Sequence, residues 1–282
     1  MRINFIQNLI DKLRGKEQKL QHKQQLLALD EIKYIFLPAL ETNKNTFLKY
    51  KDCYKGKDIV LVASGPTMLQ YHNDLLKDAV HIGVNNVFEK ENVQLDYLFV
   101  QDNLTIRSEN QEKVQEKANN YRKGICKKFY GEHYCANIKI TEQDYDEACA
   151  ERYYFIDQQL PVSPYAMMSA DITTRPLNEW SSVIFAALEF AFWTHPRRIY
   201  LVGCDASANG HIVTKNLEDF CTIKDRLVYG WHQYANYWKW HYPDIEVISI
   251  NPVGLKGLFK DVYTQNYIDE HPESLEIASI IN

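Results

Sequence analysis

Short apolar runs, each followed by a small or polar residue, recur along this chain and predict buried strands. Five such runs occupy residues 59–63, 80–84, 97–100, 199–202 and 246–250. Their apolar residues are contiguous rather than alternating, which is typical of strands buried on both faces of a parallel sheet. Helical segments are expected between them. The pattern therefore predicts an α/β fold with a Rossmann-like, mostly parallel sheet flanked by helices.

The connecting segments differ in how clearly they predict structure. Helices are expected at residues 68–77, 110–123, 181–192 and 234–240. Between residues 103 and 175 the regular spacing of apolar residues is lost. A tyrosine-rich polar stretch at 127–157 is followed there by a loop with several prolines. Because a long irregular stretch in a compact domain is usually a lid or a substrate insert, we expect an insert here.

The expected organisation is an N-terminal helical extension at residues 1–50, a nucleotide-binding α/β domain at 51–265 with a mobile lid around 207–228, and a C-terminal tail at 266–282. The extension carries apolar residues at helical spacing beside basic ones, namely Ile6, Leu9, Ile10 and Leu13. Such a helix packs on its own domain or on a second subunit of a homo-oligomer. The alternative is peripheral contact with the inner membrane, for which four apolar side chains are few.

Composition narrows the class of protein. The chain has 282 residues, of which 45% are hydrophobic, enough for one large domain. The net charge of −5 leaves no broad basic field, so a duplex nucleic-acid partner is not expected. The six cysteines form no CxxC pair and no zinc spacing with histidine, and the chain starts without an apolar signal core. Both features favour a reducing, cytoplasmic setting.

Polar residues gather where the predicted strands end. The sequence Ser64-Gly65-Pro66-Thr67 follows the first strand, and the later strands end at Asn85, Asn86, Asp102, Gly203 and Asp205. Ligands of open α/β sheets bind beyond the carboxyl ends of the strands, where a glycine turn before a helix presents N–H groups to a phosphate. The alternative role of Asn and Asp at such positions is helix capping. Neither GxxxxGK[ST] nor GxGxxG occurs, which disfavours Walker-type kinases and ordinary dinucleotide-binding dehydrogenases.

The strings at residues 59–67, 83–86 and 199–205 together resemble those of family 42 sialyltransferases. They equally resemble the broader domain family named for archaeal 6-hydroxymethylpterin pyrophosphokinase. The resemblance covers roughly residues 55–260. It implies a bacterial surface-glycan glycosyltransferase whose partners are a nucleotide-sugar donor, CMP-linked, and a glycan acceptor. No metal or other cofactor is expected.

The resemblance assigns roles residue by residue. It places Gly65, Pro66 and Thr67 on the loop that holds the CMP-sugar, and it implies further nucleotide contacts at Asn85, Asp102, Ser181, Gly203 and Asp205. At Asp102 the family has asparagine.

The family's general base is a histidine after a mobile lid, and this role falls on His232, with Tyr229 beside it. Two lid tyrosines that hold the leaving phosphate are replaced by Ser207 and Val213. The residues that could hold the leaving phosphate with a positive charge in place of these tyrosines are His211, Lys215, Lys224 and Arg226.

Three functional hypotheses remain. The first is sugar transfer from a nucleotide donor, in which His232 accepts the proton of the attacking hydroxyl, a task that suits histidine as a residue type. The second is a magnesium-dependent diphosphokinase, with Asp102 and Asp205 holding the ion. The third is a non-catalytic nucleotide- or glycan-binding protein. A requirement for a metal ion distinguishes the second hypothesis from the first. Loss of turnover in His232→Ala with binding intact excludes the third.

Overall fold

The structure is a computed structural model, and it describes residues 15–16, 19, 37–91, 93–101, 116–133, 150–157, 169–207, 217–272 and 279–281. Within this part of the chain no helix is long and apolar enough to cross a membrane. The expected apolar stripe of the N-terminal extension at residues 6–13 lies outside the described residues.

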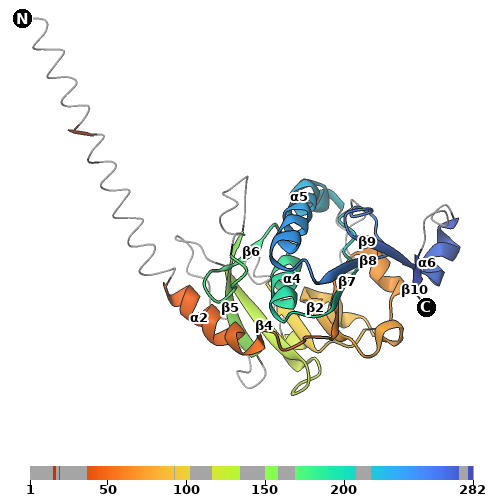
Figure 1. Ribbon diagram of the computed structural model, residues 1–282, viewed down its shortest axis with the longest axis horizontal. Coiled ribbons are helices and arrows are strands. Elements are labelled where there is room, and N and C mark those ends of the chain that lie inside the picture. Colours follow the sequence, from red (N-terminus) through yellow and green to blue (C-terminus); the bar gives the residue numbers. More distant parts are fainter. Residues whose placement is uncertain are drawn as a thin grey trace, which may run out of the picture.

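A single parallel sheet organises the described part of the chain, in which ten strands follow the order β10-β9-β8-β7-β1-β2-β3-β4-β5-β6 (Figure 1). All nine neighbouring pairs are parallel. The predicted α/β fold with a mostly parallel sheet is therefore confirmed. The strands are β1 (Asp58–Val62), β2 (Val80–Val84), β3 (Tyr97–Val100), β4 (Lys127–His133), β5 (Ala150–Asp157), β6 (Leu177–Glu179), β7 (Arg198–Val202), β8 (Glu246–Ile250), β9 (Lys260–Thr264) and β10 (Ser279–Ile281).

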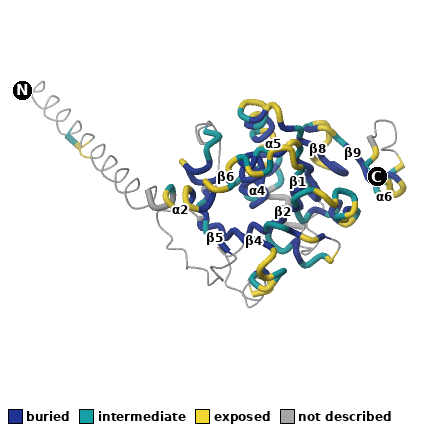
Figure 2. Tube along the Cα trace, turned by 60° about the horizontal axis from the view of Figure 1, so that its bottom comes forward, coloured by how far each residue is buried: buried dark blue, intermediate teal, exposed yellow. Residues whose placement is uncertain are grey.

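Alternate residues of the central strands enter two separate cores, which explains why the apolar runs are contiguous. In β1, Ile59 and Leu61 belong to one buried cluster, whereas Val60 and Val62 belong to the other. Each face of a strand carries every second side chain, so a strand covered on both faces must be apolar throughout. Figure 2 shows the resulting concentration of buried positions along the central strands and α4.

Helices cover one face of the sheet and short helical segments cover the other. The first face packs against α2 (Leu37–Phe47), α4 (Ile184–Trp193) and α5 (Leu217–His241). The second face packs against the 3₁₀ segments Pro66–Gln70, Asn73–Leu76 and Asn85–Glu89 and the helical residues 116–120. Every residue of α4 is buried, because α5 lies on its outer side. Stacking of Phe185 on Tyr234, with ring centroids 4.8 Å apart, is one of the contacts between these two helices. The last helix, α6 (Gln265–Glu270), follows β9.

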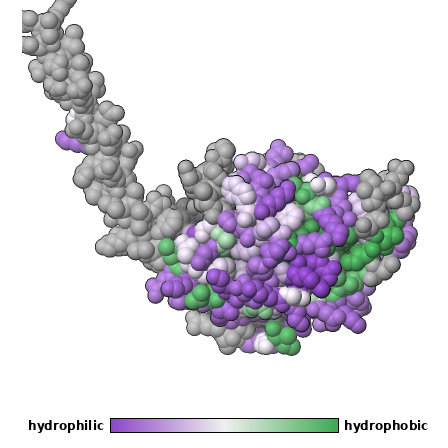
Figure 3. Space-filling view, in the orientation of Figure 1, coloured by the Kyte–Doolittle hydropathy of each residue, from purple (hydrophilic) through white to green (hydrophobic). Residues whose placement is uncertain are grey.

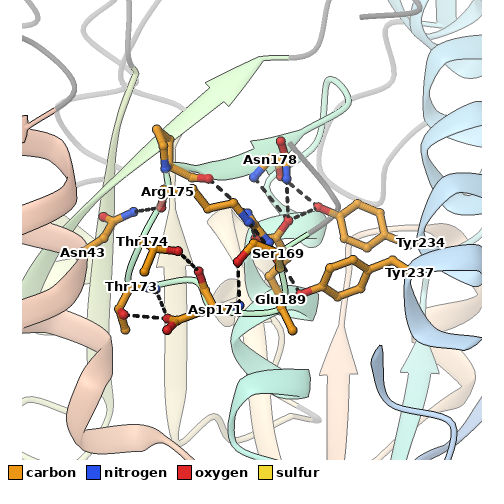
Figure 4. A network of polar contacts seen from close by, with 12 residues as sticks. Asn43, Ser169, Asp171, Thr173, Thr174, Arg175, Asn178, Glu189, Tyr234 and Tyr237 are labelled. Carbon is orange, nitrogen blue, oxygen red and sulfur yellow. Dashed lines mark hydrogen bonds and ion pairs between the residues drawn. The ribbon is translucent and has the colours of Figure 1, made fainter. Parts of the chain in front are cut away.

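A buried polar network ties α4 and α5 to the strand β6 (Figure 4). The Glu189 carboxylate, fully buried on α4, accepts hydrogen bonds from Arg175 Nη1 at 2.7 Å, Asn178 Nδ2 at 3.0 Å and Tyr234 Oη at 2.5 Å. Arg175 also donates from Nη2 to Tyr237 Oη at 3.5 Å. These contacts join three segments, residues 175–178, α4 and α5, so the network fixes where α5 lies over the sheet.

The stretch expected as a lid or insert, residues 103–175, contributes two strands instead, so that expectation is wrong for β4 and β5. Its tyrosines pack inward, since Tyr130 and Tyr153 are at most 1% exposed. Its charged side chains have bonding partners: Arg152 pairs with Glu132 at 3.0 Å across the two strands, and buried Lys128 donates to the carbonyl oxygen of Tyr121 at 2.7 Å. Partners of this kind let a polar sequence form a central strand.

Four further segments differ from the expected ones. Residues 68–77 form two 3₁₀ segments rather than one helix, because extended Tyr71 and His72 separate them and the Asn73 side chain binds both backbone groups of Gln94. The aromatic helix expected from residue 234 already begins at residue 217. Of the expected lid, residues 208–216 lie outside the described residues, and 217–228 form the first half of α5. The expected C-terminal tail contains β10, which extends the sheet.

Candidate functional site

The loops that follow β1 and β7 pack tightly together at the carboxyl edge of the sheet. These strands are neighbours, with Val62 opposite Val202, and Gly65 N donates to Gly203 O at 2.8 Å. Thr67 N donates to Asp205 Oδ2 at 3.0 Å, and the Thr67 hydroxyl donates to Oδ1 of the same carboxylate. The expectation that residues 64–67 and Asp205 share one sheet edge is thus confirmed.

Two glycines make this close approach sterically feasible. A Cβ atom on Gly65 would lie 2.4 Å from Gly203 O and 2.6 Å from Asp205 Cγ. Gly203 has φ of +63°, and its Cβ would lie 2.3 Å from Ala63 O. Both positions therefore require glycine for loop packing alone, whether or not a ligand binds there.

The same contacts remove the donors that a phosphate would need from this loop. Gly65 N and Thr67 N donate inside the protein, Pro66 has no N–H, and Met68 N donates to Gly65 O at 3.0 Å. Within the expected phosphate loop at residues 64–67, Gly65 and Thr67 therefore have no N–H group left for a phosphate. Asp205 is only 5% exposed, and its burial raises its pKa although the hydrogen bonds from Thr67 oppose that effect. This carboxylate caps the 3₁₀ segment at Pro66–Gln70, the alternative role expected for such residues.

The end of β3 carries a buried glutamine that sequence reasoning missed. Gln101 is 4% exposed; its backbone N donates to Asn85 Oδ1 at 3.1 Å and its Nε2 donates to Tyr153 Oη at 2.7 Å. Its Oε1 is buried and accepts no hydrogen bond from the described residues. Leaving a buried acceptor unpaired costs roughly 1–3 kcal/mol, which a ligand donor would recover. The neighbouring Asp102 lies outside the described residues.

The first turn of α4 lies on the same side of the sheet as the Gln101 side chain. Phe99, two residues before Gln101, packs against Phe190 of α4 with ring centroids 5.5 Å apart. The chain passes from β6 through α4 back to the start of β7, so α4 begins at the carboxyl edge. Its N-cap residue, Val183, provides no side-chain cap, but Ser182 accepts hydrogen bonds from Ile184 N at 3.4 Å, through Oγ, and from Phe185 N at 3.3 Å, through its carbonyl oxygen. The positive end of the helix dipole favours an anion near this helix start, although these two N–H groups are already bonded.

The residues that lead into α4 add a second unpaired group. Trp180 is 5% exposed, and its Nε1 finds no acceptor among the described residues. The next residue, Ser181, is half-buried and has φ of +60°. The predicted Ser181 contact thus lies just before the start of α4, next to a buried donor.

Left-handed backbone occurs at four positions of this edge. Asn85, Ser181, Ala206 and Asn251 have φ between +45° and +60°, and they follow β2, β6, β7 and β8 respectively. Such conformations cost of order 1–3 kcal/mol for residues with side chains. They also occur at Asp52, Arg122 and His195, which precede strands at the opposite edge, so backbone strain does not by itself mark the site. Next to Ala206, Gly254 N donates a 2.7 Å hydrogen bond to Asp205 O.

The predicted base is an exposed residue of α5. Trp231 packs into the core against Phe185, with ring centroids 5.1 Å apart, whereas His232 points to solvent. Tyr229, 44% exposed and one turn before His232, contacts the Trp180 ring edge-on with centroids 5.2 Å apart. This contact places the Tyr229 turn of α5 beside the start of α4. The catalytic role of His232 stays a prediction.

The remaining predicted residues are less informative. Ser64, Pro66 and Asn86 are half-buried, and Ser207 is 8% exposed. His211, Val213 and Lys215 lie outside the described residues, whereas Lys224 and Arg226 are half-buried on α5. Within the described ranges, no three His, Cys, Asp or Glu side chains come close enough to hold a metal ion.

Comparison with known proteins gives one distant similarity. No family model matches the chain, and no curated protein matches it. Among solved structures, it is similar to the sialyltransferase CstII from Campylobacter jejuni, whose structure was determined in complex with a substrate analogue, CMP-3FNeuAc. The identity is 12%, the match covers 68% of this chain and 80% of that one, and the TM-score is 0.41. A likeness this distant determines neither ligand nor reaction.

Proposed function

We propose that the protein is a glycosyltransferase that moves a sugar from a nucleotide-activated donor, CMP-linked, to a hydroxyl of a glycan. The observation that carries the proposal is a pair of buried, unpaired groups at the carboxyl edge, Gln101 Oε1 and Trp180 Nε1. One accepts and one donates, and because they follow β3 and β6, three positions apart in the sheet, they suit different parts of one extended donor, such as its base and its sugar hydroxyls. The positive end of the α4 dipole, which follows β6 at the carboxyl edge, suits the phosphate of the donor.

In this proposal each group has a separate task. Gln101 and Asn85 hold the nucleotide or the sugar, and the first turn of α4 stabilises the negative charge that develops on the leaving phosphate. His232 accepts the proton of the attacking hydroxyl. The sequence resemblance supports the assignment of His232 and the CMP-linked donor. The proposed reaction is independent of metal ions.

The phosphoryl-transfer alternative is disfavoured by Asp205. Both of its carboxylate oxygens accept hydrogen bonds from Thr67, so the carboxylate is not turned toward a ligand. A magnesium site there would require these bonds to break. Addition of EDTA separates the two reactions, because it abolishes magnesium-dependent phosphoryl transfer and leaves the proposed sugar transfer unchanged.

The nucleotide site is tested by titrating CMP, UDP, GDP and ATP, with and without magnesium, into the wild type and Gln101→Leu. We expect CMP to bind, and the variant to lose roughly ten- to a hundredfold in affinity, since it loses the amide contacts of a desolvated group. Gln94→Leu is the matched control, because Gln94 is exposed near the opposite end of β3. Unchanged affinity in Gln101→Leu would overturn the site, and absence of sugar transfer from CMP-, UDP- and GDP-linked donors would overturn the function.

A further inference from the structure

A second cavity lies at the amino edge of the sheet, opposite the candidate nucleotide site. Its volume is about 460 Å³, within the range of small-molecule pockets. Val80, Tyr97 and Lys127, the first residues of β2, β3 and β4, line it. The remaining walls include Tyr50 and Tyr54, which lie in and just after the 3₁₀ turn that follows α2.

The charges that line this cavity cancel one another. Glu151 Oε1 accepts from Lys49 Nζ at 2.6 Å and from Lys127 Nζ at 2.8 Å. Asp96 is the second carboxylate in the lining, and its Oδ2 accepts from His81 N at 2.9 Å. Glu151 also forms a side-chain hydrogen bond with Tyr50, whereas the other oxygen of Asp96 accepts no hydrogen bond from the described residues. The cavity therefore has a free acceptor on Asp96 and spare ammonium protons, but no excess charge to pair with an ionic ligand.

Three tyrosines supply the aromatic surface and further donors. Tyr54 Oη and Tyr97 Oη share one hydrogen bond of 2.5 Å, so one of the two hydroxyl protons remains available to a ligand. Burial, followed by the charge of Glu151, raises the pKa of Tyr50, and burial also raises the pKa of Tyr54 and Tyr97. All three hydroxyls thus stay protonated donors at neutral pH. Tyr97 is held rigidly, because its ring packs against Phe129 and Phe190.

We infer that this cavity binds a neutral sugar unit of a glycan, through aromatic contacts with the tyrosines and hydrogen bonds to Glu151 and the two lysines. A pyranose ring combines apolar C–H faces with hydroxyls that both donate and accept, which matches this lining. A phosphate or carboxylate ligand would meet lysines already paired with Glu151, and an apolar ligand would leave the polar groups unpaired. The inference goes beyond the proposed function, since it concerns the opposite edge of the sheet and needs no nucleotide.

The test is saturation-transfer NMR with the full-length protein and three neutral disaccharides, lactose, maltose and cellobiose, at millimolar concentration. We expect transfer from at least one sugar, undiminished by saturating CMP. Glu151→Gln should weaken binding roughly ten- to a hundredfold, as expected for a hydrogen bond to a charged group, and Tyr54→Phe about two- to tenfold. Glu246→Gln is the matched control: Glu246 forms the same kind of pair with Lys260, at 2.6 Å, on β8, and it does not line the cavity.

The outcomes are distinct. Absence of transfer from all three sugars, displacement by CMP, or equal loss in Glu246→Gln overturns the inference. Tighter binding of glucuronic acid than of neutral sugars also overturns it, because an uncharged cavity gives no preference for an anion. Tyr54→Phe serves as the deciding variant if Glu151→Gln lowers the melting temperature, since it removes one oxygen atom and leaves both ion pairs intact.

Discussion

Removal of the Glu189 carboxylate should be among the most damaging single changes outside the candidate site. Glu189→Ala leaves Arg175, whose side chain is only 9% exposed, without its ionic partner, and it removes the acceptor of Asn178 Nδ2 and Tyr234 Oη. Breaking a buried ion pair by removing one partner costs about 3–5 kcal/mol. Because a domain has only about 5–15 kcal/mol of stability in total, this loss is a large share.

The assay is urea denaturation followed by tryptophan fluorescence, with the free energy of unfolding compared between wild type and variant. Glu189→Gln keeps a hydrogen-bond acceptor but not the charge, so its free energy of unfolding should lie between those of the wild type and Glu189→Ala. The double variant Glu189→Leu/Arg175→Met, which removes both charges, should recover much of the loss, because no unpaired charge remains. A loss below about 1 kcal/mol in Glu189→Ala, the range of an exposed ion pair, would refute the reasoning.

Three further predictions concern the edges of the sheet and the proposed base. Gly203→Ala should destabilise the protein by about 2 kcal/mol or more in the same assay, from backbone strain and a clash. Gly257 also has a positive φ, of +77°, but a Cβ there would meet no atom within 4 Å, so Gly257→Ala should destabilise the protein less. Equal losses of stability in the two variants would contradict the packing argument. Burial raises the pKa of Asp58, but hydrogen bonds from Arg197 and Arg198 outweigh burial and lower it. The contribution of Asp58 to stability is therefore present above the usual Asp pKa, and it is lost as the pH falls through the lower pKa of the folded state. The stability difference between wild type and Asp58→Asn should therefore shrink in urea titrations below about pH 4, and a difference independent of pH would count against this. His232→Ala should lower turnover about 10²- to 10⁴-fold without changing nucleotide affinity, whereas exposed Asn236→Ala on the same helix should keep full turnover; full activity of the histidine variant excludes it as the base.

The sequence by itself determined the fold class and the central strands. Residues 59–62 and 199–202 are apolar at every position, and such runs predict doubly covered strands without knowledge of their neighbours. The polar turns that follow them predicted which residues meet at the carboxyl edge. Contiguous burial and turn chemistry are local properties, so they can be recognised in a single sequence.

Only the tertiary structure decided which polar residues are buried and what their partners are. Lys128 and Arg152 belong to strands because Tyr121 and Glu132 satisfy them, and these partners do not stand out in the sequence pattern. Asp205 was expected to face a ligand, but it is bound to Thr67, 138 positions away in the chain. Gln101 is an ordinary polar residue in the sequence, and it becomes a candidate ligand contact because folding buries its amide beside Tyr153 and leaves one oxygen unpaired. Hydrogen-bond satisfaction depends on groups that folding brings together from distant parts of the chain, and therefore no local pattern predicts it.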